Sequence, residues 1–339
     1  MLIEQHASWL ALNNVVGCPN NCVYCFLRQR GCHPKIMCSS RKAVENLLNS
    51  ELYRKDMPIC IMPNTDAFAT PSNKKQLFLV CQALKRQRIP NLITVITKRK
   101  VTLQDCAYIA GFRKKGLNIN IYVSYSGLEA AFEKGIRCKN SLEAIETMKN
   151  LKKYHIPCIH YWRPLLPQNT DIKTLQRVLN IVKKYCIASC MTGLKLYPYM
   201  NCRTYWPDAQ KLFDNGINPE CFVPKGSFDN IVKLAAKVNY RVFVDNVCIL
   251  SNIQKIPCEY GIYNSRRCRR YNVCSEEQRQ RCGQFYDFKQ PCQIRTDKNY
   301  SLSEILEVIK QQKVSIIRQK VNTSSYWQSS FTNDEWLEL

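Results

Sequence analysis

The sequence predicts an α/β fold, a partial or full barrel of parallel strands and helices, followed by a cysteine-rich C-terminal extension. From residue 8 to about 245, short apolar runs alternate with longer segments of helical periodicity. The apolar runs are nearly continuous, which is typical of parallel strands that are buried on both faces. Beyond residue 246 the alternation stops, and Cys, Arg, Asn and Gln become abundant.

Seven apolar or β-branched runs are expected to be the strands. They span residues 11–16, 58–63, 92–97, 119–125, 157–162, 192–197 and 240–245. Segments with a clear helical period lie between them, at 39–53, 73–87, 141–154 and 171–185. Thr102, Ser141 and Asp171 stand where helix N-caps are expected. Six or seven strand–helix units suit a barrel, whose chemistry gathers at the C-terminal ends of the strands.

The chain is expected to have three parts. Residues 1–245 form the barrel, residues 246–299 a Cys/Arg-rich metal-binding extension, and residues 300–339 a C-terminal helix and tail. The last part contains Ser301 and Glu304, whose spacing fits a capping box at a helix start.

The charge favours a polyanionic partner. The chain has 50 Lys and Arg against 26 Asp and Glu, a formal net charge of +24. Nucleic acid is the simplest polyanion, and an acidic protein partner is the alternative.

The 20 cysteines favour a reducing compartment. A disulfide scaffold would be shorter and would carry a secretion signal, and the first residues show no such leader. No apolar run approaches the ~20 residues of a membrane span. We therefore expect a cytoplasmic protein with no membrane association, in which most cysteines are packing residues.

A cysteine triplet directly follows the first predicted strand. The segment GCPNNCVYCFL places Cys18, Cys22 and Cys25 at C-x3-C-x2-C spacing. Three thiolates this close can each ligate one iron of a [4Fe-4S] cubane, which leaves the fourth iron open to a substrate or cofactor. Tyr24 and the apolar residues after Cys25 would keep water from the site.

A zinc site is the alternative for this loop. Structural zinc takes four ligands, and His33, Cys32 and Cys38 lie close in sequence to the triplet. The position of the triplet after the first strand favours the cluster, because that is where barrel chemistry lies.

The triplet resembles that of the radical SAM superfamily, whose members use S-adenosylmethionine (SAM). Four further segments resemble the spore photoproduct lyase branch in their order and spacing, which does not by itself imply lyase activity. They are PNTDAFATPSNKK (63–75), ITKRK (96–100), VSYSGLEAAFEKG (123–135) and RPLLPQNTD (163–171). The chain departs from that pattern at Phe26, Ala67 and Gln168, where the branch has Tyr, Pro and Gly.

The resemblance implies a fold, a radical SAM barrel, and a chemistry. SAM would bind the open iron through its amino and carboxylate groups, and one electron from the cluster would cleave its sulfonium. The resulting 5′-deoxyadenosyl radical would abstract hydrogen from the substrate. An electron donor of the flavodoxin or ferredoxin type is also implied.

Four residues are candidates for binding SAM on this analogy. Asp66, or carbonyls near it, would accept hydrogen bonds from the amino group, and Ser124 would lie near the ribose or carboxylate. Arg163 would pair with the carboxylate, for which a guanidinium is well shaped. Tyr24 would line the same site. The structural alternatives are a helix cap for Asp66, a turn residue for Ser124 and a surface charge for Arg163.

A second group of cysteines lies in the extension. Cys258, Cys268, Cys274 and Cys282 stand in a segment with little apolar content, where packing explains thiols poorly. We expect an auxiliary [4Fe-4S] cluster there, with structural zinc as the alternative. Cys248 is able to replace Cys258 as a ligand. Arginines and tyrosines alternate in the same segment, as phosphate contacts and base stacking require.

Three functions follow from these features. The first is a radical SAM enzyme that acts on nucleic acid, in DNA repair or in DNA or RNA base modification. The second is a radical SAM enzyme with an auxiliary cluster that modifies a peptide or protein. The third is a non-catalytic, metal-stabilised nucleic-acid-binding protein, against which the intact triplet argues.

Overall fold

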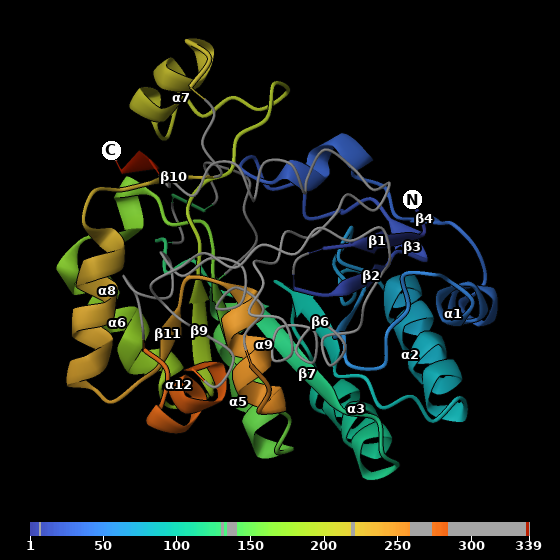
Figure 1. Cartoon of the computed structure of the whole chain (residues 1–339). Helices are drawn as coiled ribbons and strands as arrows, with labels where there is room; N and C mark the ends of the chain where they lie inside the picture. The colour runs from blue at the N-terminus through green and yellow to red at the C-terminus, as the bar shows by residue number, and fades with distance from the viewer. Residues whose placement is uncertain are drawn as a thin grey trace, which may run out of the picture.

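A computed structural model describes residues 1–6, 8–129, 132–133, 141–217, 221–257, 273–283 and 337–338. Its centre is an eight-stranded sheet with seven parallel strands (Figure 1). In spatial order the strands are β1 (Ile3–Gln5), β2 (Leu10–Leu12), β5 (Ile59–Ile61), β6 (Ile93–Thr97), β7 (Ile119–Ser124), β8 (Cys158–Trp162), β9 (Ala188–Met191) and β11 (Val242–Phe243). Only β1 runs antiparallel to its neighbour. Within the described ranges β1 and β11 are the two edges of the sheet, so the barrel is partial.

Helices connect the parallel strands and flank the sheet (Figure 1). They are α1 (Ser40–Leu48), α2 (Pro71–Arg86), α3 (Leu103–Lys114), α5 (Ser141–Lys153), α6 (Ile172–Val182) and α8 (Ser227–Lys237). The four helices predicted from periodicity are confirmed. Thr102 caps α3 in a capping box with Asp105, and Asp171 caps α6 through the backbone N–H of Thr174.

Shorter elements complete the described structure. They are β3 (Val15–Val16), η1 (Phe26–Arg30), β4 (Lys35–Ile36), η2 (Pro167–Asn169), α7 (Pro207–Asp214), β10 (Phe222–Val223), α9 (Asn246–Gln254), α12 (Glu276–Gly283) and β12 (Leu337–Glu338). Strands β3 and β4 pair antiparallel and flank the cysteine loop. The predicted capping box at Ser301 and Glu304 lies outside the described residues.

The strands bury both of their faces, as the unbroken apolar runs predict. On β7, Ile121 and Val123 pack in the outer core under the helices, whereas Tyr122 points to the inner, concave face. Helix α9 crosses that concave face, and its Leu250 packs in the same inner cluster as Tyr122. Its last residue, Gln254, donates to the carbonyl of a residue just before β5 at 3.2 Å. Helix α9 thus covers part of the inner face of the sheet.

The strand predicted at residues 192–197 is wrong. The sixth parallel strand is β9 at Ala188–Met191, whose small residues Ala188 and Ser189 give a weak strand signal. The segment after it leaves the sheet and forms an isolated antiparallel bridge between Leu194 and Phe222. The run predicted at 11–16 is also divided, because buried Asn13 and Asn14 separate β2 from β3. In the part of the chain that is described, no helix is both long and apolar enough to cross a bilayer.

A buried histidine ties three strands together. On β8, His160 has no exposed surface, and its Nε2 lies 2.8 Å from the carbonyl oxygen of Tyr125. A carbonyl only accepts, so Nε2 carries the proton and Nδ1 accepts from Ser189 Oγ at 2.7 Å. Burial lowers the pKa of His160 from 6.5 to about 4.

We expect this histidine to make the fold sensitive to acid. Because its folded pKa is below its unfolded value, the stability it confers is complete above pH 6.5 and is lost as the pH falls through about 4. The loss amounts to roughly 3 kcal/mol at most. Urea unfolding of the protein and of His160→Gln between pH 7 and 4 measures it. The variant should be less stable at pH 7 and should show a shallower pH slope; equal slopes would contradict the assignment.

Candidate active site at the carboxyl ends of the strands

The cysteine loop is folded by its own backbone. Gly17 precedes Cys18 with φ +88°, and a Cβ at this position would lie 2.4 Å from the carbonyl oxygen of His33. Only glycine fits such a close approach in the left-handed region. The N–H of Gly17 donates to Asn64 O at 3.1 Å, and that of Cys18 donates to Gly31 O at 3.0 Å. These bonds fix the loop against the end of β5.

The loop holds three thiols of different exposure. Cys22 is 4% exposed, whereas Cys18 and Cys25 are half-buried. The N–H of Cys25 donates to Cys22 O at 3.0 Å, which makes a tight turn between the last two cysteines. Burial raises the pKa of Cys18 to about 12, and the charges of Asp66 and Cys25 add to the rise. In the metal-free protein this thiol keeps its proton, so that iron would displace the proton on binding.

The donor set of the loop suits three irons of a cubane. A cubane takes one cysteine on each of three irons, and this short loop supplies three thiols. Among the described residues, no three His, Cys, Asp or Glu side chains are grouped so as to hold one metal ion.

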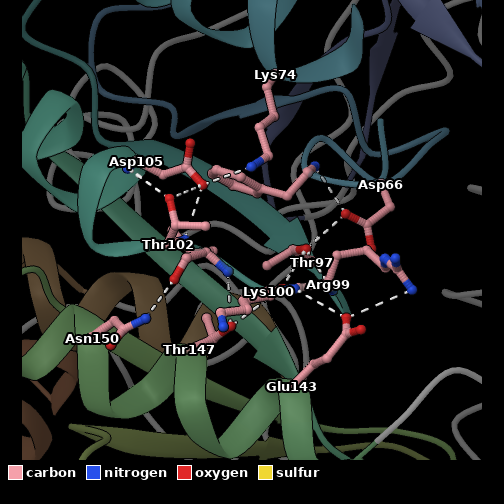
Figure 2. A network of polar contacts seen from close by, with 12 residues as sticks. Asp66, Lys74, Thr97, Arg99, Lys100, Thr102, Asp105, Glu143, Thr147 and Asn150 are labelled. Atoms are coloured by element: carbon pink, nitrogen blue, oxygen red, sulfur yellow. Dashed lines mark hydrogen bonds and ion pairs between the residues drawn. The ribbon is translucent and has the colours of Figure 1, made fainter. Parts of the chain in front are cut away.

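Asp66 links the cysteine loop to the strand ends, and Figure 2 shows its carboxylate beside Thr97. Its carboxylate is 4% exposed and accepts four hydrogen bonds. The donors are Asn20 Nδ2 at 2.8 Å, Thr97 Oγ1 at 2.7 Å, and the backbone N–H groups of Phe68 at 3.0 Å and Lys98 at 2.8 Å. Burial raises the pKa of Asp66, and these hydrogen bonds act in the opposite direction.

These four donors define the role of Asp66 in the structure. They come from the cysteine loop, the end of β6 and the turn after β5, so the carboxylate holds three segments in register. Both oxygens are already engaged, which makes Asp66 a positioning residue. The helix-cap alternative is not observed, because Thr70 caps α2 by accepting from the N–H of Asn73.

Two cations reach the cysteine loop from the strand ends. Lys98 follows β6, and its Nζ donates to Tyr24 OH and lies 5.0 Å from the Tyr24 ring centroid. Arg163 follows β8, and its Cζ lies 5.6 Å from the ring of Phe26, the residue after Cys25. Arg163 Nη1 also donates to Tyr161 OH at 2.9 Å.

The predicted residues therefore gather at one edge of the sheet. Tyr24, Asp66 and Arg163 all contact the cysteine loop or belong to it. Ser124 ends β7 and pairs in register with Tyr161 of β8, so it stands at the same edge. Lys98 was not singled out from the sequence, although its place directly after a predicted strand was the signal that could have found it.

A covering segment, residues 192–206, packs over the loop. Its Leu196, Met200 and Trp206 share one hydrophobic cluster with Cys22 and Tyr24. This packing gives the inner side of the cysteine loop an apolar environment, which tunes the potential of a cluster and protects it from water.

The thiols of the extension are only partly described. Cys258 and Cys268 lie outside the described residues. Asn252 of α9 contacts Cys274, with Nδ2 3.6 Å from Sγ, and donates to Cys248 O at 3.1 Å. Cys282 of α12 is 5% exposed. The part of this group that is described thus lies beside α9.

Helix α12 is tied to the end of α9 through Gln278. Its Nε2 donates to Ile256 O at 2.7 Å and lies 3.6 Å from Cys282 Sγ. The side chain of Gln278 has no exposed surface. This contact fixes one of the predicted metal ligands next to the barrel.

Solved structures that are similar to this chain include radical SAM enzymes, spore photoproduct lyase among them. A radical SAM methyltransferase from Sphaerobacter thermophilus matches at 10% identity and a TM-score of 0.49, over 72% of this chain and 68% of that chain. Spore photoproduct lyase complexed with dinucleoside spore photoproduct matches at 8% identity and a TM-score of 0.48, over 69% and 75%.

The radical SAM methyltransferase TsrM from Kitasatospora setae, with tryptophan substrate and a SAM analogue bound, matches at 11% identity and a TM-score of 0.43, over 56% of this chain. This chain spans only 36% of the length of TsrM. No protein family model and no curated protein matches the sequence. At these identities and TM-scores, function has to be argued from the chain's own residues.

Removing the Asp66 carboxylate should destabilise the protein. Asp66→Ala leaves four donors, on Asn20, Phe68, Thr97 and Lys98, without this acceptor, which costs about 3 kcal/mol. Urea unfolding at neutral pH measures the loss. Asp171→Ala is the matched control, since it removes one exposed helix cap and should cost about 1 kcal/mol. Equal losses in the two variants would contradict the central role of Asp66.

Proposed function

We propose that this protein is a radical SAM enzyme that acts on a nucleic acid, in repair or base modification. The observation that carries the proposal is the C-x3-C-x2-C loop at the carboxyl end of the strands, with Lys98 and Arg163 converging on it. The peptide-modifying enzyme remains the second candidate, supported by the cysteine-rich extension. A lyase reaction is one form of the first proposal.

At the cluster site, different residues of the chain would hold the irons, bind SAM and exclude water. The three thiolates of the cysteine loop would hold three irons. When bound, the cluster supplies the electron that cleaves the sulfonium of SAM into methionine and a 5′-deoxyadenosyl radical. Lys98 and Arg163 are suited to a carboxylate, and Arg163 can bind it with two parallel hydrogen bonds. Tyr24 and Phe26, with the covering segment, would exclude water from the reacting atoms.

Charge supports the nucleic-acid substrate. The net charge of +24 favours a polyanion, and the described surface near the loop contributes exposed Arg28 and Arg30. The arginine-rich segment of the extension, residues 266–281, would add phosphate contacts. A reducing cytoplasm suits both the cluster and the twenty cysteines.

An auxiliary [4Fe-4S] cluster in the extension is part of the proposal. Its ligands would be Cys258, Cys268, Cys274 and Cys282, with Cys248 as the alternative to Cys258. The contacts of Asn252 and Gln278 with Cys274 and Cys282 support a site beside α9. Zinc is the competing metal, and an iron count separates the two: about eight irons per chain for two cubanes, about four for one.

Cys22→Ala should abolish SAM cleavage. With only two of its three cysteine ligands the loop should not retain a cluster. The anaerobically reconstituted variant should therefore lose about four irons per chain and form no 5′-deoxyadenosine after reduction. Cys38→Ser is the matched control, a nearby half-buried cysteine outside the triplet. It should keep both iron and cleavage. A protein that carries only zinc, or a Cys22→Ala variant that still cleaves SAM, would refute the proposal.

Lys98→Met should weaken SAM binding. We expect the dissociation constant for SAM to rise about tenfold or more, because the variant lacks the half-buried cation that would pair with the carboxylate of SAM. The iron content should not change. Lys100→Met in the same loop is the control, since Lys100 is exposed and pairs with Glu146. Isothermal titration with the reconstituted protein measures both. Equal SAM affinities in the two variants would show that Lys98 does not bind the cofactor.

A further inference from the structure

A row of three aromatic rings starts at the cysteine loop and ends at the surface. Phe26 and Tyr197 lie 6.1 Å apart between ring centroids, and Tyr197 stacks on Tyr199 at 5.6 Å with an interplanar angle of 17°. Phe26 is half-buried, Tyr197 is half-buried and Tyr199 is 44% exposed. The row thus presents an outer ring to solvent beside the proposed cluster.

The outer rings are held in place before any ligand arrives. The hydroxyl of Tyr199 donates to the carbonyl oxygen of Phe26 at 2.8 Å, which joins the covering segment to the cysteine loop. Leu196 and Met200, on either side of the pair in sequence, are buried in the cluster that contains Cys22. Because folding has already ordered these side chains, a ligand that stacks on them loses little binding free energy to side-chain entropy.

A cation flanks the inner tyrosine of the row. Lys195 Nζ lies 5.7 Å from the centroid of the Tyr197 ring. A lysine in this position is suited to a phosphate of a strand whose base stacks on the neighbouring ring.

We propose that Tyr197 and Tyr199, with Lys195, form a stacking platform for a base of a single-stranded nucleic acid substrate. This inference rests on the proposed function, and it names where the strand lies. An exposed ring offers a base its π-face, and Lys195 contacts a neighbouring phosphate. A base stacked on Tyr199 would place the adjoining nucleotide toward Phe26 and the cysteine loop.

A single-stranded oligodeoxynucleotide with one 2-aminopurine tests the platform on the reconstituted protein. Stacking on tyrosine should quench the fluorescence of 2-aminopurine, and a strand with an abasic residue in its place should bind more weakly. A polyglutamate peptide of similar charge should bind more weakly than the strand. Absence of quenching, or equal affinity for the peptide and the strand, would overturn the platform and favour an acidic peptide partner.

Substitutions test whether Tyr199 is the ring on which the base stacks. Tyr199→Leu should weaken strand binding about tenfold, whereas Tyr199→Phe, which keeps the ring, should bind within about twofold of the wild type. Tyr108→Leu is the matched control, a 56% exposed tyrosine on α3 that packs on Phe78. Lys195→Gln should lower the slope of log affinity against log salt by about one. If Tyr199→Leu and Tyr108→Leu bind the strand equally, the platform is refuted.

Two readouts on the wild type separate this proposal from the enzymatic one. If the protein forms 5′-deoxyadenosine from SAM but does not quench the probe, the platform fails and the enzyme stands. If it quenches the probe but never cleaves SAM, the enzyme fails and the platform stands as a binding site.

Discussion

The arrangement of the site depends on one buried carboxylate. Asp66 lies in the turn after β5, yet it binds Asn20 of the cysteine loop and both Thr97 and Lys98 at the end of β6. A buried carboxylate is tolerated because its oxygens are fully hydrogen-bonded, and the same bonds determine where each donor stands. The backbone bond from Lys98 to Asp66 also directs the Lys98 side chain toward Tyr24. The positions of the candidate cofactor ligands at this site therefore depend on a residue that need not touch a cofactor.

Further polar contacts lie along residues 97–105, the segment that joins β6 to α3 (Figure 2). Lys74 of α2 binds Asp105 at 2.8 Å, and Asp105 in turn caps α3 with Thr102. Thr147 of α5 receives the N–H of Val101 at 2.9 Å. The segment between β6 and α3 is thus bound on both sides, so the strand end that carries Lys98 has little freedom to move. Such support keeps functional groups in place.

The architecture could be predicted from the sequence because its signals are local and strong. Continuous apolar runs such as ITVIT and helical periods with caps such as Asp171 identify the parallel sheet and its helices. Three cysteines in eleven residues identify the loop. The strand at 188–191 was missed because Ala, Ser and Cys have no marked strand preference, and its identity comes from pairing with β8 and β11.

The contacts of the site could not be predicted in the same way. That Asp66 engages four donors, that Arg163 lies over Phe26, and that Tyr199 reaches back to the cysteine loop are relations between residues far apart in sequence. The hydrogen bond from Tyr199 to Phe26 spans 173 positions. Asp66, Ser124 and Arg163 all follow or end strands, which the sequence indicates, but only the fold specifies their partners.

Helix α9 lies along the inner face of the partial barrel, from one end of the strands to the other. It starts beside Tyr161, where Asn246 Nδ2 lies 3.4 Å from the phenol oxygen, and it ends beneath the amino end of β5. The helix therefore covers the inner face of the sheet from the carboxyl end of β8 to the amino end of β5. Its first residue stands at the strand edge that carries the cysteine loop, so a change in the position of α9 would be felt first at that edge.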